Sequence, residues 1–263
     1  MAISKEVPLT SPESLSEESI QSYRRNGFVR VPGVISKEEA EEYRQAALAA
    51  AERIESNHKG DVFTQLVNVW RQDEVLKRLT LDPNVGRIAE RLTGVPLRLW
   101  HDQVLIKAPQ KSTPTEFHQD QPYWPHANSP NPISVWIALC DVPVERGCMT
   151  FIPGSHRYKD LRAQNLRTTT AENSFFNVAP ELMWDQRVTI PLRAGDCTFH
   201  HGRCAHMATP NLTDEPRVAH VVIYVDAVTR YTGKRHVVTD PLGLEEGAPL
   251  EGELFPEVRT FGS

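Results

Sequence analysis

The chain has 263 residues, of which 40% are hydrophobic and 24% charged, with a formal net charge of −5 and a pI near 6.1. This acidic balance argues against a nucleic-acid partner, because proteins that bind phosphate backbones are usually basic. The longest apolar runs, such as VVIYV at 221–225, are too short to span a bilayer, so no membrane segment is expected. The N-terminal residues lack the apolar stretch of a secretory signal, which makes the cytoplasm the expected location.

The first third of the chain predicts helices after a polar start. Residues 1–13 are polar with two prolines and are expected to be flexible. Ser16 can cap a helix that runs to about Asn26, and Gly27 is placed to end it. Residues 28–35 then predict a short strand and a turn.

Two further helices are expected before residue 96. Ser36 and Glu39 form a capping box at the start of a long Ala-rich helix over residues 36–56. Another helix is predicted near residues 84–93, ending at Gly94. We expect these helices to pack as a layer on the remainder of the chain.

From Pro96 onward the sequence becomes rich in short β-type segments separated by Pro, Gly, Asn and Asp. This pattern is typical of a barrel or of two packed sheets. We therefore expect one domain over residues 1–263, with a helical layer on a β-core. The expected β segments are 97–109, 116–124, 133–142, 149–153, 187–192, 196–208 and 217–228.

Residues 156–186 form a long, polar and weakly patterned segment. Loops of this length in a compact domain are usually lids or binding loops, so a lid is expected here. The start of the segment is basic. Its positive charges could bind an anionic substrate, but runs of charge are more often the solvent-exposed face of a helix. The basic residues are Arg157, Lys159, Arg162 and Arg167.

Four cysteines occur without any CxxC pair, so the sequence indicates neither a zinc ribbon nor a disulfide framework. We expect buried free thiols, because free cysteine packs as a small hydrophobic residue. The four are Cys140, Cys148, Cys197 and Cys204.

The sequence TEFHQDQPYW, residues 115–124, places a histidine and an aspartate two positions apart. In an extended strand, His118 and Asp120 would point to one face and Gln119 to the other. An imidazole beside a carboxylate is either a structural hydrogen-bonded pair or part of a metal site. A facial triad for non-haem Fe(II) needs a second histidine on another strand.

The segment CTFHHGRCAH offers three candidates for that second histidine: His200, His201 and His206. Arg217 follows 11 residues after His206. A fixed arginine beyond a metal suits a dicarboxylate cosubstrate, because the planar guanidinium binds a carboxylate through two donors.

Three segments together resemble the phytanoyl-CoA dioxygenase family of Fe(II)/2-oxoglutarate-dependent oxygenases. They are FHQDQPYW, ISVWIALCDVPVERGCMTFIPGSH and GDCTFHHGRCAHMATPNLTDEPRVA. The resemblance covers roughly residues 17–230 and is strongest over 100–226. It implies a mainly β fold with α, in which a double-stranded β-helix (jelly-roll) core is flanked by N-terminal helices. It also implies the cofactors Fe(II), 2-oxoglutarate and O2.

The resemblance carries over to individual residues. His118, Asp120 and His206 match the iron ligands, and Arg217 matches the residue that holds the distal carboxylate of 2-oxoglutarate. Trp136, 18 residues after His118, matches a tryptophan near the cosubstrate.

Other positions match less closely. Gln103, Lys107 and Thr115 match residues that often line the cosubstrate pocket. The family often has Gly-Ser after the distal histidine, where this chain has Met207-Ala208, so the serine hydroxyl is lost unless Thr209 replaces it. Close to the HxD pair, Trp124 and His126 are candidates for lining the substrate pocket, with packing at the rim as the alternative.

The resemblance implies an enzyme that oxidises an unactivated C–H bond of a small-molecule metabolite and releases succinate and CO2. Hydroxylation is the expected oxidation. Asp120 is retained, whereas related halogenases have a small residue at this position, so halogenation is disfavoured. Desaturation, cyclisation or epimerisation at the same site remains an alternative, as does a metal-binding cupin without oxygenase activity. The substrate and the oligomeric state stay open.

Overall fold

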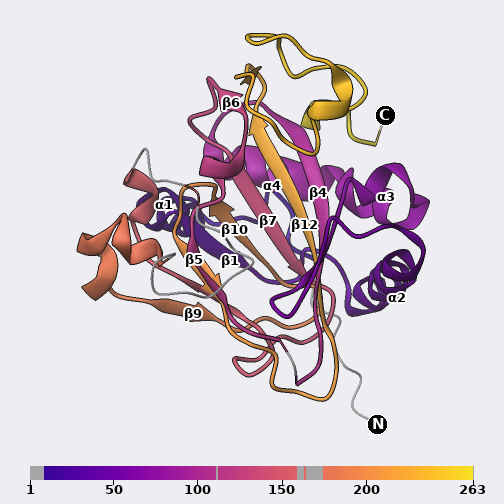
Figure 1. Cartoon of the computed structure of the whole chain (residues 1–263), viewed down its shortest axis with the longest axis vertical. Coiled ribbons are helices and arrows are strands. Elements are labelled where there is room, and N and C mark those ends of the chain that lie inside the picture. Colours follow the sequence, from indigo (N-terminus) through magenta and orange to yellow (C-terminus); the bar gives the residue numbers. More distant parts are fainter. Residues whose placement is uncertain (1–8, 111, 159–162, 164–173, 263) are drawn as a thin grey trace.

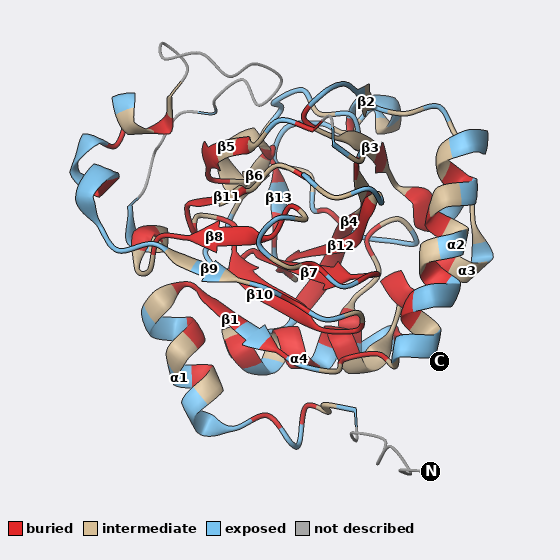
Figure 2. Ribbon diagram, turned by 90° about the horizontal axis from the view of Figure 1, so that it is seen from below, coloured by how far each residue is buried: buried red, intermediate tan, exposed pale blue. Residues whose placement is uncertain are grey.

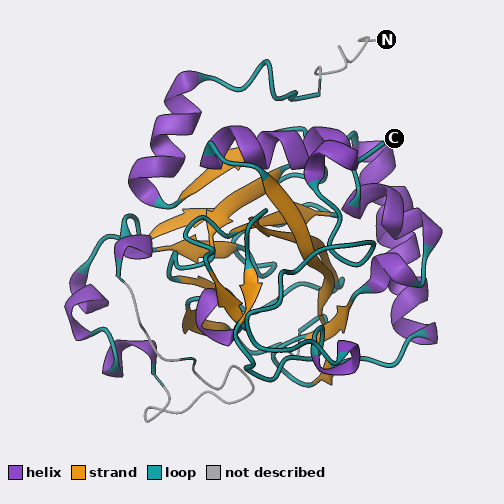
Figure 3. Cartoon of the chain, turned by 90° about the horizontal axis from the view of Figure 1, so that it is seen from above, coloured by secondary structure: helices purple, strands orange, loops and turns teal. Residues whose placement is uncertain are grey.

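The computed structural model describes residues 9–110, 112–158, 163 and 174–262. Its core consists of two facing antiparallel β-sheets, and helices cover the outer side of the larger sheet (Figures 1 and 3). This arrangement confirms the expected jelly-roll core with flanking N-terminal helices.

The larger sheet, called the major sheet, has seven strands, and the smaller one, the minor sheet, has four. The major sheet runs in the order β1 (Phe28–Val31), β10 (Cys197–His201), β7 (Ile133–Ala138), β12 (Arg217–Asp226), β4 (Leu97–Lys107), β3 (Thr64–Val67) and β2 (His58–Lys59). The minor sheet runs β5 (Thr115–His118), β11 (His206–Ala208), β8 (Met149–Phe151) and β9 (Val188–Ile190). A separate pair joins β13 (Arg230–Tyr231) to β6 (His126–Ala127).

Four α-helices precede β4: α1 (Glu17–Asn26), α2 (Lys37–Arg53), α3 (Glu74–Thr80) and α4 (Pro83–Thr93). The expected caps are present, since Ser16 accepts a hydrogen bond from the backbone of Ser19, and Ser36 and Glu39 form the capping box. Gly27 ends α1 with a φ of 83°, a left-handed conformation that glycine adopts without steric cost. Short 3-10 turns lie at Val69–Arg71, Gln121–Tyr123, Ser155–Arg157, Phe175–Asn177, Pro180–Trp184, Asp240–Leu242 and Val258–Thr260.

Side-chain alternation along the major sheet separates a helix face from a face toward the minor sheet. On β12, Val218 and Val222 pack in the cluster shared with the helices, whereas Ala219 and Val221 pack toward the minor sheet. Every residue of β12 is buried, as Figure 2 shows for the central strands. By the same alternation, Arg217 lies on the minor-sheet face.

Some expected elements differ from the structure. Residues 196–208 form two strands in different sheets, because the chain turns at Gly202 between β10 and β11. The strand expected over 116–124 ends at His118, and a 3-10 turn containing Pro122 follows. The helix α3 and the strands β2, β3, β6 and β13 were not predicted; β2, β6 and β13 have only two residues each.

The expected flexible start and the expected lid fall partly outside the described residues, at 1–8, 159–162 and 164–173. Within the described part, the backbone N–H of Thr10 donates to the carbonyl of Gly33, and the carbonyl of Thr10 accepts from the side-chain amide of Asn84. Phe175 and Leu182 are buried in a small hydrophobic cluster with Phe117, so this part of 156–186 is packed rather than loose.

All four cysteines are buried and free, as expected. Among the described residues, no helix combines the length and apolarity needed to cross a membrane.

Candidate metal and cosubstrate site

The HxD pair lies where the minor sheet meets a turn. His118 is the last residue of β5, and Asp120 follows in a helical conformation with φ −76° and ψ −45°. Gln119 points away, as the alternation predicts, and its side-chain amide donates to the carbonyl of Arg203 at 2.6 Å. The turn keeps the carboxylate of Asp120 beside the imidazole of His118.

His206 is the first residue of β11 and pairs directly with His118 across the minor sheet. Their ring centres lie 4.2 Å apart. One ligand atom from each of His118, Asp120 and His206 lies within 4.8 Å of the others, a spacing that can hold one metal ion. Of the three histidines that the sequence left open, His206 completes this group.

Backbone carbonyls fix the tautomers of both imidazoles. His118 Nδ1 lies 2.7 Å from the carbonyl of Glu116, and His206 Nδ1 lies 2.9 Å from that of Cys204. A carbonyl oxygen only accepts, so each Nδ1 carries the proton and each Nε2 keeps a lone pair. A metal-binding histidine typically donates its other N–H in this way.

Asp120 divides its oxygens between two sets of neighbours. Oδ1 lies 3.5 Å from His118 Nε2 and 3.8 Å from His206 Nε2. Oδ2 accepts from Ser134 Oγ at 3.2 Å and lies 3.5 Å from His200 Nε2. Ser134 and His200 are partners across β7 and β10. The major sheet therefore holds one oxygen while the other faces the two metal-ligand candidates.

The ionisation states suit a cation. Burial, and next the neighbouring His118, lower the pKa of His206 to about 3, so its imidazole is neutral at physiological pH. Burial alone would raise the pKa of Asp120, but the surrounding imidazoles hold it well below its ordinary value. A neutral imidazole and an ionised carboxylate are the forms that bind divalent metals.

Arg217 is a buried cation with unused hydrogen-bonding capacity. Its residue is 2% exposed, and its Nη1 donates to the carbonyl of Leu105 at 3.1 Å. Its Cζ lies 5.2 Å from the centre of the Trp136 ring, and its Nε has no partner among the described residues. Burial lowers the pKa of the guanidinium to about 10. A buried guanidinium without an acid partner in the described chain favours an anionic ligand.

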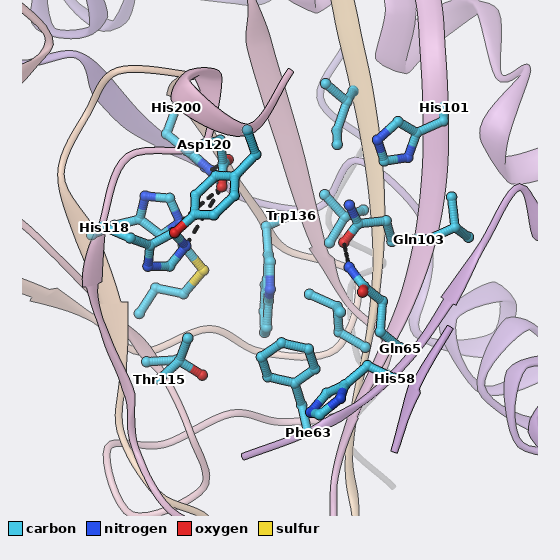
Figure 4. A pocket seen from close by; sticks show the side chains of 18 of the residues that line it. His58, Phe63, Gln65, His101, Gln103, Thr115, His118, Asp120, Trp136 and His200 are labelled. Atoms are coloured by element: carbon cyan, nitrogen blue, oxygen red, sulfur yellow. Dashed lines mark hydrogen bonds and ion pairs between the residues drawn. The ribbon is translucent and has the colours of Figure 1, made fainter. Parts of the chain in front are cut away.

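One cavity of about 420 Å³ connects these groups. The three metal-ligand candidates and Arg217 all line it. Figure 4 shows His118 and Asp120 on one side, Gln103 on the other and Trp136 between them. Further predicted residues that line the cavity are Thr115, Trp136, Gln103 and Trp124.

Three predicted candidates, Lys107, His126 and Thr209, are not among the residues that line the cavity. Lys107 directs its amine to the carbonyls of Val62 and Thr113, at 2.9 and 2.6 Å, and is not among the cavity-lining residues. His126 is also absent from the lining, because its ring packs on Trp100.

The hydroxyl of Thr209 donates to the carbonyl of Val144 at 2.7 Å, so it does not replace the missing serine. Thr115, which pairs with Ala208 across the minor sheet, instead places a threonine on the cavity wall.

Three residues have positions in the site that the sequence did not predict, although it offered His200 as a possible metal ligand. His200 and Ser134 contact Asp120 only because two sheets face each other, and no spacing signals such a contact. His101 lines the cavity although its burial, at 1% exposed, resembles that of an ordinary core residue. Alternation with Gln103 along β4 was the signal that could have found it.

The model of the phytanoyl-CoA dioxygenase family matches residues 23–219. The chain belongs to this family. A curated family relative is "Phytanoyl-CoA dioxygenase domain-containing protein 1" of Rattus norvegicus, 27% identical over 158 residues. The match covers 59% of this chain and 54% of the relative. The chain thus spans about half the length of the first curated relatives it matches.

Solved structures extend the family comparison over nearly the whole chain. The non-haem alpha-ketoglutarate-dependent carbocyclase SnoK from nogalamycin biosynthesis has a TM-score of 0.85 and 38% identity, covering 95% of this chain and 99% of its own. The epimerase SnoN, in complex with Fe3+, alpha ketoglutarate and nogalamycin RO, has a TM-score of 0.80 and 39% identity, covering 92% and 98%. These neighbours are non-haem 2-oxoglutarate-dependent enzymes, in agreement with the resemblance seen in the sequence.

The residues of this chain fit iron and 2-oxoglutarate. The lone pairs on two Nε2 atoms and one oxygen of Asp120 suit iron. The unused donors of Arg217, in the same cavity, suit a carboxylate of the cosubstrate.

Proposed function

We propose that the protein is an Fe(II)- and 2-oxoglutarate-dependent dioxygenase that oxidises a C–H bond of a small-molecule metabolite. One observation carries the proposal: three metal-ligand candidates and a buried arginine without an acid partner in the described chain line a single cavity. A cupin that only bound metal would have no use for that cation, and burying it unpaired costs stability.

Each residue has a role in this proposal. His118, Asp120 and His206 hold the iron, and Arg217 pairs with the distal carboxylate of 2-oxoglutarate. The ring of Trp136 lies against the guanidinium and keeps water from it. When bound, iron together with 2-oxoglutarate and O2 supplies the oxidising power, and the cosubstrate leaves as succinate and CO2.

Ser134 and His200 orient Asp120 by holding its second oxygen. A carboxylate fixed in this way offers the other oxygen to the metal without rotating, which lowers the cost of assembling the site. Thr115 and Gln103 complete the polar lining around the cosubstrate.

Hydroxylation is the expected outcome for the substrate. Ring closure or epimerisation is the second candidate, favoured by the near-complete coverage of the carbocyclase SnoK and the epimerase SnoN. The complex of SnoN with nogalamycin RO further supports a natural product of that type as the substrate.

The proposal is tested by adding Fe(II) and 2-oxoglutarate to the protein without oxygen. An oxygenase of this type should show a weak visible charge-transfer band, and the Arg217→Met variant should need far more 2-oxoglutarate to produce it. Succinate release after oxygen is admitted then reports turnover. A protein that binds iron but never develops the band would be a metal-binding cupin.

A further inference from the structure

The cavity wall opposite the metal-ligand candidates carries two histidines with complementary nitrogen atoms. His101, from β4, extends toward the cavity in Figure 4. His236, from the segment after β13, lines the same cavity. Their ring centres lie 5.8 Å apart, close enough for one small group to contact both.

The backbone fixes the tautomer of His101. Its Nδ1 lies 3.1 Å from the carbonyl of Asp102, which can only accept, so Nδ1 carries the proton. Nε2 is therefore a hydrogen-bond acceptor, and it has no partner among the described residues. Burial lowers the pKa of His101 to about 3, so Nε2 remains an acceptor at physiological pH.

His236 has the opposite tautomer. The backbone N–H of Val238 donates to its Nδ1 at 3.2 Å, so that nitrogen carries no proton. Nε2 then carries the N–H and is a donor. Burial lowers the pKa of His236 to about 4, which keeps the ring neutral. The two imidazoles together offer one acceptor and one donor.

Local structure holds both rings in place. Ile223 pairs with His101 while Tyr224 pairs with Leu99, which leaves Trp100 as an extra residue in a β-bulge. Bulges of this kind redirect side chains next to active sites. The Trp100 ring centre lies 5.5 Å from that of His101 and 5.2 Å from that of His236, so the indole packs against both.

The rest of the lining limits the charge of the substrate. Among the described lining residues, the ionised side chains are Asp120 and Arg217, and both have roles with the metal and cosubstrate. Phe63, Tyr123 and Trp124 add flat aromatic surface. An anionic substrate would find no further cation on these walls, whereas a neutral ring system would find surfaces to stack on.

We propose that His101 and His236 form a hydroxyl-binding pair that selects a neutral, ring-containing substrate bearing a hydroxyl group. The hydroxyl donates to Nε2 of His101 and accepts from Nε2 of His236. A carboxylate can only accept and an ammonium can only donate, so neither satisfies both nitrogens. This inference rests on the proposed function and narrows its substrate class.

The test uses three probes on one ring frame: 2-hydroxyanthraquinone, 2-methoxyanthraquinone and anthraquinone-2-carboxylate. The protein is loaded with Fe(II) and 2-oxoglutarate without oxygen, the visible band is recorded, and dissociation constants are measured by equilibrium dialysis. The hydroxy probe should bind roughly tenfold more tightly than the methoxy probe, which corresponds to ~1.4 kcal/mol. The carboxylate probe should bind more weakly still.

Variants test whether the preference for the hydroxy probe over the methoxy probe depends on His101 and His236. His101→Phe and His236→Phe should each reduce the preference to about twofold or less. His236 is only partly buried, so its variant tests the pair even where a change at buried His101 impairs folding. His58→Phe is the matched control, because His58 lines the same cavity beside Phe63, away from His101 (Figure 4). This variant should keep the full preference.

The outcomes separate this inference from the proposed function. If the visible band forms but the wild-type protein binds the hydroxy and methoxy probes equally, or binds neither, the hydroxyl-binding pair is refuted. A preference that survives in both His101→Phe and His236→Phe also refutes it. If the band itself is missing, the proposed function fails and this inference fails with it.

Discussion

Replacing Arg217 by methionine separates what this buried cation costs from what it contributes. Burial lowers the pKa of the guanidinium from 12.5 to about 10, and this shift corresponds to ~3 kcal/mol of destabilisation of the folded protein at neutral pH. In return the side chain makes one hydrogen bond to Leu105, worth ~1 kcal/mol, and one contact with the Trp136 ring, worth ~1 kcal/mol. Methionine keeps much of the length without the charge. The free energy of unfolding without cosubstrate should therefore stay unchanged or rise by ~1 kcal/mol.

Binding of the cosubstrate should respond in the opposite direction. Removing one partner of a buried charge pair typically costs ~2–5 kcal/mol. At ~1.4 kcal/mol per tenfold, the dissociation constant of 2-oxoglutarate should rise by roughly two to three orders of magnitude. Arg217→Lys should recover only part of this, because an ammonium cannot make the forked contact. Iron affinity should barely change, since no metal-ligand candidate contacts the guanidinium.

Denaturant unfolding of the cosubstrate-free protein and calorimetric titration of 2-oxoglutarate measure the two effects. Lys107→Met is the matched control, because it removes the other buried cation of this region. That variant leaves the carbonyls of Val62 and Thr113 without their donor but should keep its 2-oxoglutarate affinity. If Arg217→Met instead loses several kcal/mol of stability and still binds 2-oxoglutarate normally, the arginine is structural. Weakened binding in Lys107→Met alone would assign the carboxylate to Lys107.

Three further predictions concern histidines. His206→Ala should abolish oxidation and sharply weaken iron binding, whereas His201→Ala should still bind iron. The reverse pattern in a metal titration would show that His201, and not His206, is the metal ligand. His200→Phe should weaken iron by about tenfold or more through loss of the contact to Asp120 Oδ2; unchanged affinity would show that Ser134 alone orients the carboxylate. His220 is fully buried, and burial lowers its pKa in the folded protein to about 3, below the value in the unfolded chain. The unfolded chain therefore binds a proton at this residue before the folded protein does, and stability is lost as the pH falls from about 6.5 toward 3. The slope is at most ~1.4 kcal/mol per pH unit. His220→Gln should flatten the acid side of the stability profile by that slope, and an unchanged slope in denaturant titrations from pH 7 to 4 would refute this assignment.

Sequence predicts the parts of the site that depend on local spacing. His118 and Asp120 are two residues apart, and the strand periodicity predicted that they would converge, although a turn and not a strand places Asp120. Arg217 begins a ten-residue strand, and its face follows from alternation along VAHVVIYV. The family resemblance then selects His206, because composition and spacing alone left three histidines open.

The remaining features depend on distances between segments remote in sequence. His200 contacts Asp120 only because β10 of the major sheet faces the turn after β5 of the minor sheet. Lys107 is placed on the cavity side by alternation, yet two backbone carbonyls capture its amine. Single-residue features such as the bulge at Trp100 leave no periodic signal, although this bulge keeps His101 on the cavity side.

In this cavity, the backbone carbonyls and the carboxylate of Asp120 together determine which ligand each histidine can bind. His118, His206 and His101 all donate Nδ1–H to a backbone carbonyl and so all present a bare Nε2. Of these three, His118 and His206 lie within 4 Å of the Asp120 oxygen Oδ1, which supplies the negative charge that a divalent metal needs. His101 has no such neighbour among the described residues, so the same tautomer there favours a neutral donor. A hydroxyl group, rather than a second metal ion, is the ligand that this nitrogen can bind.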